Sequence, residues 1–566
     1  MFIGCRAAVT ASLVALAVAV GACGGAKEGS TPSAGQKATA QKLIDIAATP
    51  RDQVKDGGTM RWPLDQFSSQ WNYNQVDGQT QATFDVVYAT LPILFVADEH
   101  TTVTANPDYV ASFDVSTSPQ VVTLKLNPKA KWSDGRPITW QDFAAQAKAL
   151  SGKDSAYSIG SSTGYERISS VKAGADQFEV VITFARPFGE WQSLFTPLYP
   201  KQADDTPKHF NTSYLDHIPV TAGPFKVDKL DKSAQSLRIV RDPRWWGKAA
   251  KLDAIAYNSP ELEAQVNAFA NGEVDRVNIG ADASLVKRAT NTQGGGVRVA
   301  GGPDFRQFTL NGTSTVLKDV QVRRALALSI NRAVIARSDL TGLNWPAVTM
   351  DNHFFVNTQK GYVDNAGEFA KFDPARARTL LDGAGWKQSG AFRKKAGKPL
   401  KLTFVIPSGV PASRQEAELA QAMAKDVGIQ IVIKTVPSDP FFDDYIIPGN
   451  FDLTVFSFIG NAFPISPNKS IYVKPKKDAK GELQVQQNFA RIGSPAIDKL
   501  LSSAEEQVDV AKGRELANQA DKLIWNEVHS LVLFQRPQNI AVSDNVVNVG
   551  AFGFKTPRYQ DMGFKK

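Results

Sequence analysis

Hydrophobic and polar positions along the chain form short blocks, in which strand-like and helix-like periods follow one another. Residues 121–126 alternate with a period of two, which predicts a strand; after a turn, Thr139 and Asp142 match the capping pattern of a helix start. Residues 401–436 predict a strand, a helix and a second strand in that order. Such a unit favours a parallel sheet, so the expected fold class is α/β.

Further along, two segments carry clear helix signals. A single helix is predicted over residues 319–340, because Leu326, Ile330 and Val334 contribute to one apolar stripe. Asp373, which is followed by a proline, is the expected N-cap of another helix.

The stretch from residue 450 to 467 changes character halfway along. Its first half is apolar, as in a buried strand, but it runs into Gly460, Asn461 and two prolines that cannot continue a central strand. In α/β sheets ligands are often held at the ends of strands. The segment around Phe458, Gly460 and Asn461 is therefore a candidate binding surface, with a simple turn as the alternative.

The N-terminal residues have the pattern of a targeting segment. An apolar run from Ala7 to Val20 follows Arg6, is too short to span a bilayer, and ends in small residues before Cys23. We therefore expect residues 1–22 to be a signal peptide. The sequence Val-Gly-Ala-Cys at its end resembles the lipobox of bacterial lipoproteins, which implies that Cys23 is lipidated and anchors the protein at the outer face of the cytoplasmic membrane. The following residues, up to 57, begin rich in Gly, Ser and Thr, as expected of a flexible tether.

Composition narrows the classes of function. At 566 residues the chain is too long for one hydrophobic core and should form about two to four domains. It has two cysteines, which excludes a disulfide framework and a cysteine-rich metal site. The net charge of +8 is spread along the chain, so no nucleic acid is expected as a partner.

Candidate catalytic motifs lack the context that their chemistry needs. Residues 160–164 spell G-x-S-x-G, but polar residues precede them, whereas a nucleophile elbow follows a hydrophobic strand. The five histidines are scattered and show no metal-ligand spacing. We therefore expect neither an enzyme, nor a metal site, nor a cofactor; a hydrolase stays the weakest alternative.

Six stretches occur in an order that resembles one family, the extracellular solute-binding proteins of peptide-type ABC importers, family 5. They are KWSDGRPITWQDF, TAGPFKV, NGEVD, LKDVQVRRALALSINRAVI, FDPARARTLLDGAGW, and VGIQIVI followed by GNFDLTVF. The resemblance implies a two-lobed periplasmic-binding-protein (clamshell) fold with an extra third domain, in which the lobes close on a ligand by hinge motion. It also implies a monomer whose partners are a peptide or peptide-like ligand and an ABC permease complex in the membrane.

The resemblance also suggests where the domains lie. The signal peptide and tether are followed by a discontinuous first lobe, an extra domain II and a lobe III. The expected segments are 1–22 (signal peptide), 23–57 (lipidated Cys and tether), 58–82 (lobe I, part a), 83–215 (extra domain II), 216–304 (lobe I, part b), 305–532 (lobe III) and 533–566 (lobe I, part c).

Site residues follow from the same resemblance. Peptide binders of the family hold the ligand's amino group with an acid in a Gly-Trp-x-x-Asp type segment, which here is Ser457-Phe458-Ile459-Gly460-Asn461. The aromatic residue is kept as Phe458, but the acid has become Asn461. Another family acid falls on Asp77, and a ligand-facing tyrosine of the extra domain falls near Tyr157.

Alternatives stay open for these residues and for the function. Phe458 is equally explained as a core residue, and Asn461 and Asp77 as turn residues. The same fold would also suit an oligosaccharide, a glycoconjugate or a metal chelate, which the missing acid favours and the lack of tryptophans in residues 450–470 disfavours for sugars. An envelope regulatory protein without a transport role is a further possibility.

Overall fold

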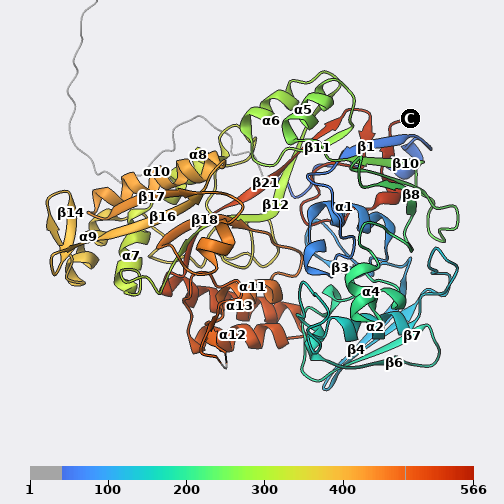
Figure 1. Ribbon diagram of the computed structural model, residues 1–566, viewed down its shortest axis with the longest axis horizontal. Coiled ribbons are helices and arrows are strands. Elements are labelled where there is room, and N and C mark those ends of the chain that lie inside the picture. Colours follow the sequence, from blue (N-terminus) through green and yellow to red (C-terminus); the bar gives the residue numbers. More distant parts are fainter. Residues whose placement is uncertain (1–40, 479) are drawn as a thin grey trace, which may run out of the picture. The chain divides into compact units, whose positions relative to one another are not determined.

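The computed structural model describes residues 41–478 and 480–566, which belong to one compact unit, Ala40–Lys566. The expected signal peptide and Cys23 lie outside the described residues. In the part of the chain that the structure describes, no helix has both the length and the apolar character needed to cross a membrane. The larger sheets have four, four and six strands, and helices pack on them (Figure 1).

The first four-stranded sheet has the order β1-β10-β9-β8. β1 runs parallel to β10, and the other neighbours are antiparallel. β8 and β9 follow each other along the chain and form an antiparallel hairpin. The strands are β1 (Thr59–Pro63), β8 (Phe225–Asp231), β9 (Ser236–Arg241) and β10 (Ala254–Asn258).

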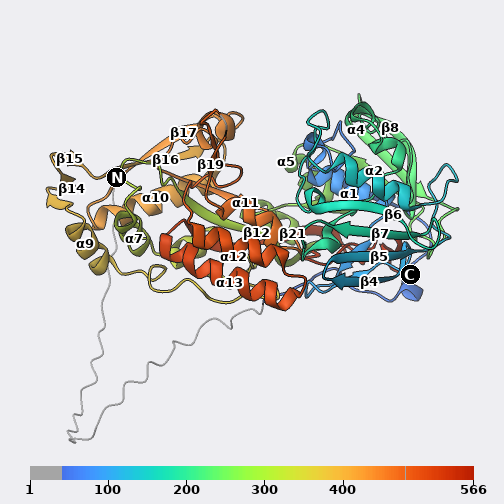
Figure 2. The ribbon, with the colours of Figure 1, turned by 90° about the horizontal axis from the view of Figure 1, so that it is seen from below.

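The second four-stranded sheet is antiparallel throughout, in the order β4-β5-β7-β6, and Figure 2 shows these strands side by side near α2. α2 begins as predicted, because Thr139 and Asp142 form a capping box in which the Asp142 carboxylate accepts from the Thr139 backbone N–H at 2.9 Å. The elements of this part are α1 (Gln81–Thr90), β2 (Phe95–Ala97), β3 (Val103–Ala105), β4 (Val110–Thr117), β5 (Gln120–Leu126), α2 (Trp140–Ala149), β6 (Ile168–Ala173), β7 (Glu179–Phe184), α3 (Lys201–Asp204) and α4 (Pro207–Thr212).

One hydrophobic core serves both of these sheets. Trp62 of β1, Leu124 of β5 and Ile239 of β9 belong to the same buried cluster, which we call the first core. The expected extra domain, residues 83–215, therefore shares its core with the first sheet, and the expected boundary at residue 82 falls inside α1.

The six-stranded sheet has the order β11-β21-β12-β18-β16-β17 and is mixed. The predicted βαβ unit is confirmed, since β16 and β17 are parallel and α10 connects them. β18, the strand predicted before Gly460, pairs with β16 in parallel and with β12 antiparallel. The strands are β11 (Arg276–Asn278), β12 (Gly295–Leu310), β16 (Lys401–Pro407), β17 (Gln430–Val436), β18 (Leu453–Phe458) and β21 (Ser530–Ser543).

Helices cover this sheet and form a second core with it, in which Leu326, Phe308 and Trp525 are buried. The helices in this half of the chain are α5 (Leu262–Ala270), α6 (Ala283–Thr290), α7 (Val320–Ser329), α8 (Arg332–Leu340), α9 (Pro374–Gly383), α10 (Pro411–Asp426), α11 (Ile465–Tyr472), α12 (Pro495–Glu506) and α13 (Val510–Glu527). The short strands are β13 (Lys387–Ser389), β14 (Phe392–Lys395), β15 (Lys398–Pro399), β19 (Lys476–Lys477), β20 (Leu483–Gln484), β22 (Val546–Val547) and β23 (Gly563–Phe564).

The predicted single helix over residues 319–340 is wrong, because the chain breaks it into α7 and α8. Ile330 is extended, with φ −96° and ψ 115°, and the Asn331 side chain accepts from the Val334 N–H as the N-cap of α8. A β-branched residue followed by asparagine favours this local alternative to a continuous helix. Val334, expected on the apolar stripe, is consequently 38% exposed.

The expected end of the tether at residue 57 is also wrong. Val54 is fully buried and bridges to Lys565, and Arg51 forms an ion pair with Asp561 at 2.8 Å. Asp45 bridges to Ala551. These residues are ordered by packing on the C-terminal segment, a contact between chain ends that local composition does not reveal.

β12 and β21 are the longest strands and run side by side along the sheet, between β11 and β18 (Figure 1). Their pairing is irregular between Gly301 and Phe305. The expected lobe boundaries at residues 304 and 532 therefore fall inside two continuous strands.

α11 and α12 have apolar residues in a separate, smaller buried cluster and are contacted by residues of the part of the chain that contributes to the first core. Arg167, which follows α2, forms an ion pair with Glu505 of α12. Glu190 accepts hydrogen bonds from the backbone N–H groups of Ile465 and Ser466 at 2.9 and 2.7 Å, at the start of α11. The negative carboxylate is well placed at this helix N-terminus.

Two carboxyl groups lie close together between α8 and α10. Glu416 is fully buried and accepts from Arg306 at 2.7 and 2.6 Å, whereas both carboxyl oxygens of Asp339 are buried without a hydrogen-bond partner. Burial and the neighbouring Glu416 raise the pKa of Asp339 to about 8, against the effect of Arg306 and Arg536. The raised pKa favours the protonated form of Asp339 in the folded protein.

The raised pKa of Asp339 predicts a pH-dependent stability. The folded state keeps a proton that the unfolded state loses between about pH 4 and pH 8, so the free energy of unfolding should fall as the pH rises through this window. Asp339→Asn should remove this contribution. Denaturant unfolding should measure the free energy of unfolding of variant and parent across this window. The difference between the two should change by about 1 kcal/mol per pH unit, so that the variant becomes relatively more stable at higher pH.

Asp426→Asn, which changes an exposed carboxylate at the end of α10, is the matched control for loss of charge alone. Equal unfolding curves for the parent and Asp339→Asn at both ends of the pH range would contradict the raised pKa of Asp339.

Candidate functional site

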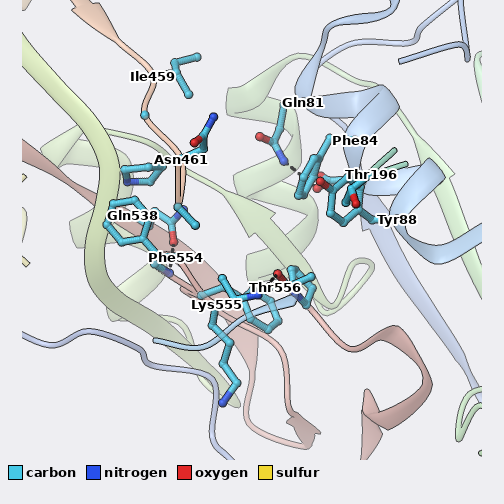
Figure 3. A pocket seen from close by; sticks show the side chains of 18 of the residues that line it. Gln81, Phe84, Tyr88, Thr196, Ile459, Asn461, Gln538, Phe554, Lys555 and Thr556 are labelled. Atoms are coloured by element: carbon cyan, nitrogen blue, oxygen red, sulfur yellow. Dashed lines mark hydrogen bonds between the residues drawn. The ribbon is translucent and has the colours of Figure 1, made fainter. Parts of the chain in front are cut away.

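A cavity of about 480 Å³ lies between α1 and the segment that follows β18. This volume is in the range of about 300–1,000 Å³ that is usual for small-ligand pockets. The segments that line it are far apart in the sequence and include α1, β11, residues 459–463, β21 and residues 550–557. In Figure 3, Gln81, Phe84 and Tyr88 of α1 lie opposite Ile459 and Asn461.

The α1 side of the cavity is an aromatic wall. Phe84 and Tyr88 lie one helical turn apart, with ring centroids 3.8 Å from each other, and Tyr73 meets the edge of Phe84 at 6.2 Å. Burial raises the pKa of the Tyr88 hydroxyl, which stays protonated. This wall offers apolar faces with polar tips, a combination that suits ligands with both kinds of group.

The C-terminal segment forms another side of the cavity and is fixed by hydrogen bonds. The Gln538 side-chain oxygen accepts from the Gly553 N–H at 2.8 Å, and the Thr556 hydroxyl oxygen accepts from the Ala97 N–H at 3.0 Å. Lys555 lines the cavity and forms an ion pair with Glu99 at 3.0 Å.

Two buried charged groups, Asp85 and Arg276, also line the cavity, and each is 7% exposed. Burial raises the pKa of the Asp85 carboxyl to about 6, while the Arg276 charge and a hydrogen bond from Gln81 oppose the rise. Burial also lowers the pKa of Arg276, whose guanidinium lies 4.0 Å above the Trp62 ring.

Three of the residues predicted from sequence line the cavity: Ile459, Gly460 and Asn461. Ile459 is 79% exposed, the most exposed large hydrophobic side chain among the described residues. At Gly460 a Cβ atom would lie 2.8 Å from the carbonyl oxygen of Pro303, so the close approach to β12 requires glycine. Asn461 also makes a turn, because its side-chain oxygen accepts from the Phe463 N–H at 2.7 Å.

Ser457 and Phe458, predicted with them, do not line the cavity. Both belong to β18, and Phe458 packs against Phe305 and Phe456 with centroids 5.9 and 5.3 Å away. Of the two explanations given for Phe458, ligand contact or core residue, the structure therefore matches the core residue.

The other two predicted contacts lie elsewhere. Asp77 is exposed in a short 3-10 helix, where its carboxylate accepts from the Gln75 side chain at 3.1 Å. Tyr157 is 4% exposed and packs edge-on against Phe210. The structure brings neither residue to the cavity.

Sequence reasoning missed the α1 residues, Arg276 and residues 550–557. One signal was present, since Asp85 is an acid inside an apolar helix and stands four residues after Gln81, with which it shares a hydrogen bond of 2.7 Å. A buried charge in such a setting is a candidate site residue. Arg276 follows Asp275 at the start of β11, and its polar neighbours in the sequence do not single it out.

The described residues contain no group of three or more His, Cys, Asp or Glu side chains arranged to hold a metal ion. What the arrangement offers chemically is a mixed apolar and charged surface inside a cavity, with side chains suited to binding.

Comparison with known proteins shows the family to which the chain belongs. The family model "Bacterial extracellular solute-binding proteins, family 5 Middle" matches residues 104–479. The chain is 38% identical over 540 residues to the oligopeptide-binding protein OppA of Mycobacterium tuberculosis (strain H37Rv), covering 94% of this chain and 89% of that protein.

Solved structures share the fold, which is that of the periplasmic binding proteins. The periplasmic EDTA-binding protein EppA matches with a TM-score of 0.83 and 24% identity, covering 94% of this chain and all of that one. The oligopeptide-binding protein AppA from Bacillus subtilis, in complex with a nonapeptide, matches with a TM-score of 0.71 and 17% identity, covering 91% of this chain and all of that one. The chain therefore belongs to the bacterial extracellular solute-binding proteins, family 5, which are transport binding proteins and not enzymes.

Proposed function

We propose that this protein is the lipid-anchored receptor of an ABC importer. It captures peptides or peptide-like ligands in the cavity between α1 and residues 459–463 and delivers them to a membrane permease. The observation that carries the proposal is this cavity, whose size and two-sided lining suit a small ligand held between two parts of the chain. The 38% identity to an oligopeptide-binding protein over most of the chain supports the ligand class.

The lining suits a ligand with a variable side-chain composition. Residues 459–461 continue from the end of β18. The Gly460 N–H donates to Pro303 and the Asn461 C=O accepts from Gln359, so the other backbone N–H and C=O groups of this segment are the ones that we propose for an extended peptide, irrespective of its side chains. The aromatic wall of Phe84 and Tyr88 provides apolar contact without demanding one partner. Of the residues predicted from sequence, we propose Ile459, Gly460 and Asn461 as ligand contacts, with Phe458 holding their strand in place.

Delivery requires that the cavity opens and closes. We propose that the irregular part of the β12–β21 pair, near Gly301 and Phe305, serves as the hinge, because a locally disrupted ladder bends more easily than a regular one. The contacts of Arg167 with Glu505 and of Glu190 with the start of α11 would then form on closure.

The peptide proposal predicts stabilisation by ligand. A random library of short peptides should raise the melting temperature of the protein, since a ligand that binds only the folded state at about 100 times its dissociation constant adds roughly 2.7 kcal/mol. Mass spectrometry of the ligand that co-purifies with the protein should identify peptides. A co-purifying oligosaccharide, glycolipid or metal chelate, with no shift by peptides, would overturn the ligand class while leaving the receptor role intact.

Two neighbouring residues should behave in opposite ways on mutation. Ile459→Ser should weaken peptide binding about fivefold and leave the melting temperature unchanged, because this exposed side chain loses about 1 kcal/mol of apolar contact only in the complex. Phe458→Ala should instead lower the free energy of unfolding by about 2–3 kcal/mol, because Phe458 is partly buried and packs against the second core. Calorimetry and thermal unfolding measure the two effects.

Ile447→Ser is the matched control, since this isoleucine is 46% exposed and lies outside the cavity. Weakening of peptide binding by Ile447→Ser as strong as that by Ile459→Ser would show that the effect is not specific to the cavity.

The anchor proposal rests on Cys23, which ends the sequence Val-Gly-Ala-Cys. Cys23→Ala should release the protein from the membrane fraction. The released protein should be folded and should still bind peptides. Cys5→Ala, the matched control in the expected signal peptide, should leave the protein in the membrane fraction. Retention of Cys23→Ala in the membrane after a salt wash would refute the lipid anchor.

A further inference from the structure

A polar alcove adjoins the main cavity at the start of α1. It is a second, smaller cavity of about 100 Å³. The residues that line both cavities, and so connect them, are Gln81, Asp85, Arg276 and Asn278. The alcove therefore extends the ligand cavity towards the end of β1 and the start of α5, where Pro63 and Leu262 line it.

Arg276 is the unusual group in the alcove. It belongs to β11, is 7% exposed, and its Nε atom is buried with no hydrogen-bond partner among the described residues. One face of its guanidinium is covered by the Trp62 ring at 4.0 Å. Asp85 and Asp65, which also line the alcove, act on Arg276 through their charges. The buried Nε donor still lacks an acceptor, and a buried donor without one is costly, so the guanidinium calls for a hydrogen-bond partner.

Asp85 does not fill that role. It influences Arg276 through its charge and not through a hydrogen bond, whereas its carboxylate accepts from the Gln81 side chain at 2.7 Å. The carboxylate of Asp85 thus has a partner of its own, and the edge of the Arg276 guanidinium is left for another acceptor.

The chemistry of the guanidinium defines that acceptor. Arginine presents N–H donors in a planar fork and has no acceptor of its own. A carboxylate matches the fork with two parallel, charge-assisted hydrogen bonds, which a neutral hydroxyl or amide oxygen does not provide. We propose that Arg276 binds a carboxylate of the ligand, so that the receptor selects ligands carrying such a group; this deepens and rests on the proposed function.

Two parts of a peptide can supply the carboxylate: its C-terminus or an acidic side chain. Three matched peptides separate them. One has a free C-terminus and no acidic residue, one has an amidated C-terminus and no acidic residue, and one has an amidated C-terminus and a single glutamate. Calorimetry should show that at least one carboxylate peptide binds the parent about tenfold or more tightly than the peptide without a carboxylate.

Arg276→Gln, which keeps the polar volume and removes the charge, should bind the three peptides with nearly equal affinity. Arg276→Lys should keep part of the preference, because it retains the charge without the fork. Asp85→Asn should strengthen the preference several-fold, because it removes a negative charge beside the incoming carboxylate; this gain keeps the inference falsifiable if the Arg276 variants fold poorly.

Lys555 is the competing cation, since it also lines the cavity. Loss of the carboxylate preference in Lys555→Met, with the preference intact in Arg276→Gln, would overturn the assignment to Arg276. Equal binding of all three peptides to the parent would overturn the inference and leave the proposed peptide function standing.

Failure of every peptide to bind would contradict the proposed function instead. The inference is then tested with glutarate and its diamide as small probes. Glutarate should raise the melting temperature of the parent but not of Arg276→Gln, and the diamide should raise neither. Equal shifts of parent and variant by glutarate would overturn the role of Arg276.

Discussion

The antiparallel pairing of β12 with β21 is the constraint on which the arrangement of the whole described unit depends. Each strand contributes buried residues to both cores: Ala300 and Ile540 to the first, Phe308 and Leu533 to the second. Because one hydrogen-bonded ladder passes between the cores, their spacing is set by backbone geometry and not by a flexible linker. The irregularity near Gly301 is the place where this ladder is weakest.

The cavity follows from that arrangement, and its sides differ in character. α1, which packs in the first core, brings the buried Asp85, and β11, at the edge of the six-stranded sheet, brings the buried Arg276. The segment after β18 brings the exposed Ile459 and a glycine pressed against the β12 backbone. The charged side chains are thus fixed in position by rigid packing, while the apolar contact comes from a segment beyond the end of a strand. Closing such a cavity would desolvate both kinds of contact at once and strengthen the charged ones.

Several elements could be predicted because their signals are local. The capping box at Thr139, the β16-α10-β17 unit and β18 depend on residues a few positions apart, and these predictions are confirmed. β12 was not predicted, since four glycines and a proline within residues 295–303 are typical of a loop. The break at Ile330 was missed because an apolar stripe with helical spacing continues across it.

The sequence by itself determined the α/β class, the family and the approximate place of one ligand-facing segment, because caps, periodicity and motifs are carried by neighbouring residues. Only the tertiary structure decided which side chains face the cavity. Asp77 and Tyr157 lie outside it, whereas Gln81, Asp85 and Arg276 line it. Such a lining is made by segments distant in sequence, and the side-chain direction at each depends on strand register and helix rotation, which packing of the two cores sets.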